Sequence, residues 1–213
     1  MTKSTASIIL LLLSLLPVTG AARTVADLLA SEPGNIFALL TRTNRLDMID
    51  YRLNNQEVAI QNLIGGESRL EGMDTTWLKL RTSDSKTVEM RMMVSGRDTV
   101  VAVIETVLTP TADSRITFWD VQWQSVRADK VFKMPCIDDF ILKTMPADMR
   151  DELSIVMAFP FIEMHFTGDR HDGIEAVFNA KESVGPGDYK RFAPYFKDTV
   201  NYRINGVKIR PVK

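Results

Sequence analysis

The sequence predicts an α+β fold made of two units, each a helix-loop-helix followed by an antiparallel β-sheet, and a duplication is one interpretation of that order. Two observations carry the prediction. Short runs alternate apolar with polar residues and are separated by turn residues, a pattern typical of half-buried antiparallel strands. Segments with helical spacing of apolar residues occur before residue 55 and again after residue 134, and each is followed by such runs.

A hydrophobic segment precedes the part of the chain that we expect to fold. Residues 8–18 are almost entirely apolar, Lys3 stands before them and small residues follow. This run is too short to span a bilayer comfortably, so residues 1–22 are interpreted as a signal peptide cleaved near Ala21 or Ala22. We therefore expect a soluble periplasmic or extracellular protein, without stable membrane insertion after cleavage.

Length and composition bound the remaining chain. It is long enough for two small units, residues 23–134 and 135–213, packed together as one globular body. The full sequence has 26 Lys and Arg residues against 27 Asp and Glu residues, and this near balance argues against nucleic acid as a partner. Cys136 is the only cysteine, so an intramolecular disulfide is excluded and packing must hold the fold.

The first helices are expected over residues 24–30 and from Asn44 onward. Asn44 is interpreted as the N-cap of the second helix, because its side chain can accept hydrogen bonds from free amides of the first turn. Leu46, Ile49 and Leu53 follow at helical spacing and are predicted to form the buried face of this helix.

Strands follow in quick succession after these helices. Residues 56–73 lack a clear period and contain glycines, so we expect a loop with one short strand over 58–63. Strands over 77–81 and 88–94 alternate apolar and polar residues. Together with two strands over residues 98–126, they predict a four-stranded meander with one apolar face that helices cover.

The last of these strands carries the predicted binding surface. Ile116 and Phe118 stand at even-numbered positions and would point to one face of a strand. Trp119, Val121 and Trp123 stand at odd-numbered positions and would point to the other face. A β-bulge near Phe118 would reconcile the two patterns, because one extra residue changes the face to which later side chains point. Phe118, Trp119, Val121 and Trp123 are the candidate binding residues, and burial of the tryptophan stripe by the second sheet is the alternative.

The second unit is predicted to begin with helices over residues 137–141 and 146–157, since proline is tolerated at a helix start. Strands over 162–167 and 174–181 alternate apolar and polar residues. A short helical turn capped by Asp188 is expected next.

The C-terminal segment carries the sharpest turn signal. Asn205 and Gly206 stand between two alternating runs and predict a β-hairpin with a type I′ turn, which needs positive φ at both central residues. With these two residues as the loop, Ile204 faces Val207.

A short internal match bears on the duplication. Residues 105–107 read Glu-Thr-Val and residues 182–184 read Glu-Ser-Val, and an aromatic pair follows each at equal spacing, at 118–119 and 195–196. The layout of two helix-loop-helix-plus-sheet units resembles that of β-lactamase inhibitor protein-like modules. This likeness concerns the layout alone.

Five segments carry a closer resemblance: Asn-Arg-Leu-Asp-Met-Ile-Asp-Tyr at 44–51, residues 113–118 and 122–123, and residues 188–190 and 194–197. With these segments the chain resembles an uncharacterised family of secreted proteins from Bacteroidales, a domain of unknown function. The resemblance spans nearly all of the mature chain. It implies no known activity and no catalytic residues.

Candidate metal ligands cluster at one place. His165, His171, Asp169 and Asp172 are close in sequence, but a metal site usually needs three or four convergent ligands. A polar turn rich in Gly and Asp explains the aspartates more simply. No metal and no cofactor are expected.

Candidate catalytic residues are few. Cys136 could pair with His165, but no supporting motif surrounds it, and a buried structural thiol is the simpler interpretation. Asp47 and Asp50 share one helical face, where such charges usually serve capping and solubility. The sequence contains no nucleophile-elbow, phosphate-loop or zinc-protease motif.

Three function classes follow. The leading hypothesis is a non-enzymatic extracytoplasmic binding or interaction module whose partner, a protein or an apolar ligand, is unknown. The first alternative is a periplasmic carrier of a small apolar or lipidic ligand, because Met90, Met92 and Met93 could line an adaptable pocket, although core packing explains them equally. The second alternative is a hydrolase with an unrecognised site.

Overall fold

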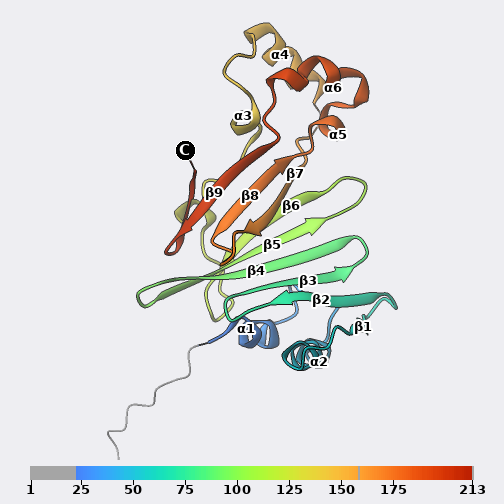
Figure 1. Cartoon of the computed structure of the whole chain (residues 1–213), viewed down its shortest axis with the longest axis vertical. Coiled ribbons are helices and arrows are strands. Elements are labelled where there is room, and N and C mark those ends of the chain that lie inside the picture. The colour runs from blue at the N-terminus through green and yellow to red at the C-terminus, as the bar shows by residue number, and fades with distance from the viewer. Residues whose placement is uncertain (1–22, 158, 213) are drawn as a thin grey trace, which may run out of the picture.

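The computed structural model describes residues 23–157 and 159–212, so the predicted signal peptide lies outside the described residues. Two antiparallel sheets form the middle of the molecule, and short helices lie at both of its ends (Figure 1). The α+β class is thereby confirmed.

In chain order the elements are α1 (Val25–Ser31), α2 (Arg42–Leu53), β1 (Ala59–Gln61), β2 (Glu67–Met73), β3 (Trp77–Ser83), β4 (Lys86–Ser95), β5 (Asp98–Val107), β6 (Asp113–Trp119), η1 (Ala128–Lys130), α3 (Ile137–Phe140), α4 (Ala147–Val156), β7 (Ile162–Thr167), β8 (Gly173–Phe178), α5 (Ala180–Val184), α6 (Pro186–Phe192), η2 (Ala193–Tyr195), β9 (Thr199–Asn205) and β10 (Lys208–Pro211).

The first sheet is a six-stranded meander in the order β1-β2-β3-β4-β5-β6. Helices α1 and α2 pack on one of its faces, and a helix-side core fills the space between them. This core includes Val25, Leu28, Met48, Leu78 and Val88. The alternation of β3, with Leu78 and Leu80 fully buried, follows the period of two that a half-covered strand requires.

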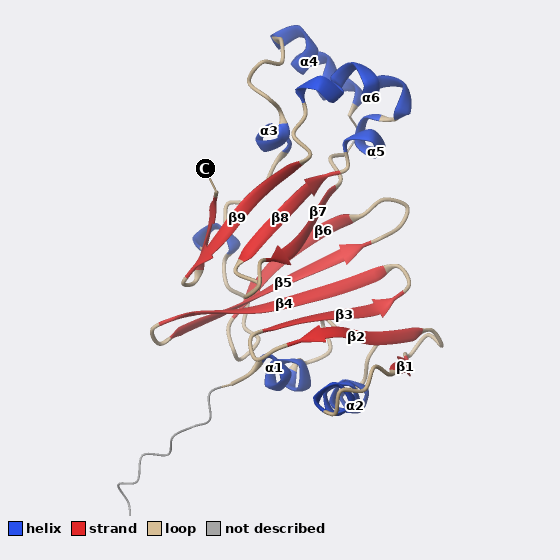
Figure 2. Cartoon of the chain, in the orientation of Figure 1, coloured by secondary structure: helices blue, strands red, loops and turns tan. Residues whose placement is uncertain are grey.

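The second sheet has four strands in the order β10-β9-β8-β7, and it packs against the opposite face of the first sheet. The core between the two sheets takes Ala102, Ile104 and Phe118 from the first sheet and Met164 and Ile174 from the second. Helices α3 to α6 gather at the far end of the second sheet, whereas α1 and α2 lie at the opposite end of the molecule (Figure 2).

Side chains of the first sheet occupy the free edge of β7. Alternate backbone N–H groups of this edge strand point away from β8, and each donates to a side chain. These bonds are Ile162 N–H to Asp113 Oδ1 at 3.0 Å, Met164 N–H to Ser114 Oγ at 2.8 Å and Phe166 N–H to Glu89 Oε2 at 3.1 Å. An edge that would otherwise leave donors unpaired is thus joined to the neighbouring sheet.

Two strand predictions differ from the structure. Residues 67–73 form strand β2, although they were expected to be mostly loop, so the meander has six strands instead of four. Its buried positions alternate, but two of them carry Ser68 and Gly72 beside Leu70, so the sequence shows no apolar period there. Strand β6 ends at Trp119 and pairs with β5 in unbroken register, so the bulge predicted near Phe118 is wrong.

The N-terminus of α2 also differs from the prediction. Thr41 is the N-cap, and Asn44 is the third residue of a reciprocal capping box in which each side chain accepts from the other's backbone N–H. Leu46 and Leu53 are 39% and 69% exposed, so the predicted buried face is wrong at these two positions. Arg45 is buried in their place.

Helix boundaries differ after β8 as well. The strand expected to reach residue 181 ends at Phe178, because α5 begins at Ala180. Helix α6 begins at Pro186 after Gly185, so Asp188 lies within the helix and is not its cap. The internal match does not join equivalent structures, since residues 105–107 end a strand whereas residues 182–184 belong to α5. It therefore gives no support to a duplication.

The C-terminal hairpin is confirmed, but its turn is displaced by one residue. Asn205 pairs with Lys208 and Ile204 with Ile209, which leaves Gly206 and Val207 as the loop. Gly206 has a φ of 59°, whereas Asn205 and Val207 have negative φ. Glycine with positive φ at the first loop position is the requirement of a type II′ turn.

We predict that Gly206→Val lowers the free energy of unfolding by about 1–3 kcal/mol, because a β-branched residue is forced to positive φ. A Cβ atom at this position would also lie 3.0 Å from Ser95 Oγ. Chemical denaturation measures the loss. Gly187→Val is the matched control, since a Cβ atom there meets nothing within 4 Å. Equal stability of both variants would show that this turn imposes no constraint.

A second prediction concerns the sheet-to-sheet contact. Ser114→Ala removes the acceptor of the Met164 N–H, and we expect a loss of about 1–3 kcal/mol in unfolding free energy because a donor is left unpaired. Thermal or urea unfolding provides the measurement, with Ser154→Ala on the exposed surface of α4 as control. A loss no larger than that of the control would contradict the role of the β7 edge.

Candidate functional site

The predicted binding residues do not form a continuous exposed stripe. Phe118 is 2% exposed and lies in the core between the sheets, whereas Trp123 is 9% exposed and lies in the helix-side core. Trp119 and Val121 are half-buried against that helix-side core. The predicted common strand face is wrong, because the chain leaves the sheet after Trp119.

A closed loop explains how Trp123 reaches the core. The Asp120 carboxylate accepts the backbone N–H groups of Gln122 and Gln124 at 2.9 and 2.8 Å. Trp123 has a φ of 63°, a rare conformation for a bulky residue, and this turns its side chain under the sheet. Its indole N–H is buried without a partner among the described residues.

The weak metal candidates do not converge. His165 Nε2 lies 3.0 Å from Glu175 Oε2 on the neighbouring strand, and Asp169 and Asp172 are exposed. His171 stacks on Trp77 with ring centroids 3.7 Å apart. Within residues 23–157 and 159–212, no group of three or more metal-ligating side chains is found.

The stacked His171 belongs to a contact that the sequence did not reveal. Its carbonyl oxygen accepts from Arg91 Nε at 3.0 Å, so the β7–β8 turn is held against the first sheet. Burial lowers the pKa of Arg91, while the charges of Asp74 and Asp172 oppose that shift. This cluster is a further contact between the two sheets, beside the hydrogen bonds of the β7 edge.

The catalytic candidates are also dispersed. Cys136 is exposed at the N-cap of α3, so the expectation of a buried thiol is wrong. Asp47 and Asp50 are both exposed on α2, and Asp50 accepts a bond from Asn54 at 3.3 Å. The three methionines Met90, Met92 and Met93 are buried in the two cores.

The segment at residues 44–51 has a structural role. Arg45 is buried and donates to the carbonyl oxygens of Leu29 and Leu40, both at 2.9 Å, and of Glu32 at 2.5 Å. The Glu32 carboxylate lies 3.8 Å from the guanidinium and accepts three backbone N–H groups of the following turn. This buried pair fixes the connection between α1 and α2.

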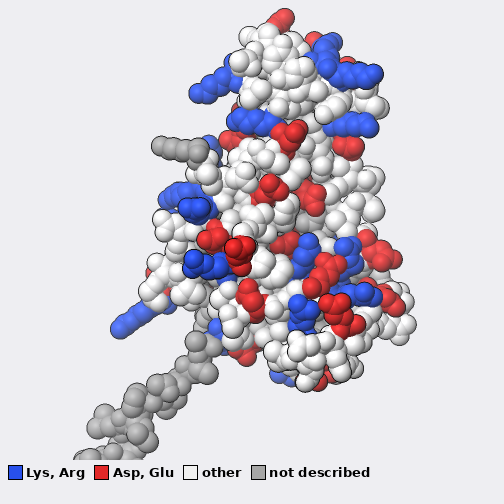
Figure 3. All heavy atoms as spheres, viewed as in Figure 1, with Lys and Arg blue, Asp and Glu red and all other residues white. Residues whose placement is uncertain are grey.

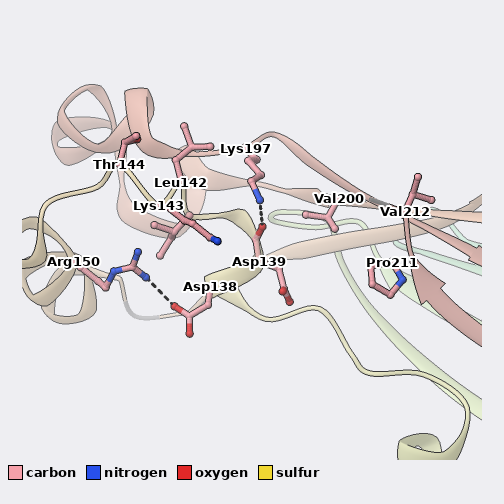
Figure 4. A pocket seen from close by; sticks show the side chains of 11 residues that line it. Asp138, Asp139, Leu142, Lys143, Thr144, Arg150, Lys197, Val200, Pro211 and Val212 are labelled. Carbon is pink, nitrogen blue, oxygen red and sulfur yellow. Dashed lines mark hydrogen bonds and ion pairs between the residues drawn. The ribbon is translucent and has the colours of Figure 1, made fainter.

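A cleft of about 830 Å³ lies between the α3–α4 segment and strands β9 and β10. Its size falls in the range of small-molecule binding sites. Figure 4 shows that the side chains around it come from α3, the loop after it, α4 and the last two strands. The apolar side chains that line it are Ile141, Leu142, Val200, Pro211 and Val212.

Backbone hydrogen bonds hold the two walls of the cleft together. Leu142 N–H donates to Tyr195 O at 2.8 Å, and Lys197 N–H donates to Phe140 O at 2.7 Å. An antiparallel bridge between residues 141 and 196 lies between these two bonds. The wall formed by the α3–α4 loop is therefore tied to the segment that leads into β9.

Three basic and two acidic side chains face the cleft. Arg150 Nη1 lies 3.2 Å from Asp138 Oδ1, and Lys197 Nζ donates to the backbone oxygen of Asp139 at 3.0 Å (Figure 4). The Asp139 carboxylate accepts from Cys136 N–H at 2.9 Å. Lys143 makes no hydrogen bond or ion pair within the described part of the chain.

Tyr202 is buried in the core between the sheets and does not line this cleft. It is 5% exposed, and burial, together with the charges of Asp139 and Cys136, raises the pKa of its hydroxyl to about 12. Sequence reasoning missed the cleft, because one wall comes from residues 138–150 and the other from residues 197–212, without any local motif.

These features define a two-sheet α+β protein with a mixed polar and apolar cleft beside its second sheet. The chain belongs to the family described as protein of unknown function (DUF3256), whose sequence model matches residues 18–208. The resemblance to an uncharacterised domain family is thereby confirmed. No curated protein matches the chain.

A solved structure shares the fold. It is a domain of an uncharacterised protein from Porphyromonas gingivalis W83, with a TM-score of 0.77 and 18% sequence identity. The match covers 90% of this chain and 98% of that domain. None of the described helices is long and apolar enough to cross a membrane.

We predict that Trp123→Ala lowers the unfolding free energy by about 3–5 kcal/mol, because a large buried side chain leaves a cavity. Denaturant titration followed by far-UV circular dichroism measures this loss. The control is Phe159→Ala, since Phe159 is 70% exposed and its truncation leaves no cavity. A Trp123→Ala variant as stable as the unchanged protein would show that Trp123 is not a core residue and would make it a candidate for surface binding again.

Proposed function

We propose that this protein is a non-enzymatic binding module that acts in the periplasm or outside the cell, with the α3–β10 cleft as its binding site. The observation that supports it is the cleft itself, which combines apolar walls with ammonium groups that no carboxylate of the described residues neutralises. Sites of this kind bind ligands whose polar and apolar parts match the lining.

The distribution of surface charge agrees with such a role. Positive and negative side chains are interspersed on the face seen in Figure 3, and neither sign forms one continuous patch there. A nucleic-acid partner would favour a continuous basic surface, so the partner is expected to be a protein or a small ligand. The extracytoplasmic location rests on the hydrophobic segment at residues 8–18.

A carrier of a small apolar or lipidic ligand is the second candidate. The apolar lining of the cleft, with Leu142 and Val200 on opposite walls, favours it. The methionines that first suggested a carrier are buried in the cores and give it no support. The two candidates differ in the size of the bound molecule, so one experiment separates them.

The test places a photoreactive amino acid at Leu142 in the cleft, with a matched position at Leu63, which is 64% exposed on the β1–β2 turn. The protein is irradiated in its native host and its mass is measured. A protein-sized adduct at Leu142 alone supports the interaction module, and an adduct of a few hundred daltons supports the carrier.

Adducts of equal yield at both positions, or none at Leu142, would contradict binding in the cleft. A hydrolase activity abolished by Cys136→Ala or His165→Ala would overturn the non-enzymatic assignment. Recovery of the protein with residues 1–22 intact would refute the proposed secretion.

A further inference from the structure

We infer that the α3–β10 cleft binds a single carboxylate attached to an apolar body, with Lys143 and Lys197 holding the carboxylate. This inference rests on the proposed binding function and names its ligand class. The argument uses the charges that face the cleft, the apolar wall opposite them and the closed edge of β10.

Two ammonium groups that face the cleft have no carboxylate partner among the described residues. The two carboxylates are already engaged, Asp138 with Arg150 at 3.2 Å and Asp139 with the Cys136 N–H at 2.9 Å. Lys197 bonds only to a neutral carbonyl oxygen, and Lys143 has no partner among the described residues. Two ammonium groups therefore remain available to an acceptor from outside the chain.

Both ammonium groups reach the same part of the cleft. In the close view the side chains of Lys143 and Lys197 end near Asp138 and Asp139, and Lys197 points to the Asp139 backbone oxygen (Figure 4). The backbone bonds between residues 140–142 and 195–197 fix the segments that carry them. The positions of their Cα atoms are therefore set before a ligand binds, which lowers the ordering cost of recognition.

The acidic side chains limit the charge of the ligand. Asp138 and Asp139 belong to the same lining, which carries one net positive charge. A monoanion gains from the lysines with little repulsion, whereas a phosphate or a polyanion would bring its further charge near these aspartates. A carboxylate is thus favoured over more highly charged groups.

The apolar side chains of the cleft determine the chemical nature of the remaining part of the ligand. Ile141 and Leu142 line one side of the cleft, and Val200, Pro211 and Val212 line the other. Their side chains offer no hydrogen-bonding groups, so the part of the ligand that lies between them is expected to be aliphatic.

The edge of β10 makes an added peptide strand unfavourable. Ile209 N–H already donates to Val131 O at 2.9 Å, and Pro211 has no N–H group. Strand addition depends on free main-chain groups along an edge. We therefore assign recognition to side chains and favour a small amphipathic carboxylate over an extended peptide.

The test titrates the secreted protein with octanoate and with octanamide, which has the same chain but no charge. Amide NMR shifts report both the affinity and the site. We expect octanoate to shift residues 141–144 and 197–200 and to bind about five- to tenfold more tightly than octanamide, as two exposed charge contacts allow. High salt should reduce this difference.

Lys143→Gln should weaken octanoate binding about threefold and leave octanamide binding unchanged. Lys130→Gln is the control, since Lys130 is exposed on η1 and lines no part of this cleft. The acid and the amide of acetyl-Leu-Val form a second pair. Tighter binding of the dipeptide acid than of octanoate would identify a peptide C-terminus as the source of the carboxylate.

Equal affinity for octanoate and octanamide, or an unchanged Lys143→Gln variant, would overturn the inference. So would shifts confined to another surface. If the photoreactive residue at Leu142 gives an adduct while octanoate does not bind, the binding function stands and the carboxylate class is wrong. Failure of both experiments would remove the function and the ligand class together.

Discussion

The hydrogen bonds from the β7 edge to Asp113, Ser114 and Glu89 determine how the two sheets lie against each other. Packing of apolar side chains between sheets is not directional and tolerates sliding. Three bonds at alternate residues of one strand allow a single register. Glu89 also lies 3.4 Å from the Lys79 ammonium and from the Trp77 indole nitrogen, so its buried carboxylate is satisfied by neighbours on its own sheet. The core between the two sheets depends on this alignment.

Periodicity predicted the elements whose environment is uniform along their length. Strand β3 alternates between buried and half-buried residues because only one of its faces is fully covered, and the C-terminal hairpin follows from its glycine. Strand β2 was missed because its bulge places Gly72 beneath Trp77, where a Cβ atom would lie 2.7 Å from the indole ring. Contact with a side chain of the neighbouring strand, and not a local backbone preference, favours glycine at this position.

The other features that the sequence did not predict also depend on contacts with residues outside the local segment. Trp123 lies in a core because the Asp120 carboxylate closes a loop around it. The prediction from alternating positions failed because it assumed that the strand continues through this residue. Arg45 is buried because three carbonyl oxygens and Glu32 surround it, although its residue type predicts exposure. The cleft needs α3, β9 and β10 together, and sequence spacing holds no information on that meeting.

The second sheet has few free main-chain groups at either edge. On β7 the outward donors are used by the first sheet, and on β10 one donor meets Val131 while Pro211 has none. Sheets with open edges can recruit strands of other molecules and grow into fibres. Here the chain's own residues occupy these donors, so an incoming strand would find few free N–H groups at either edge of this sheet.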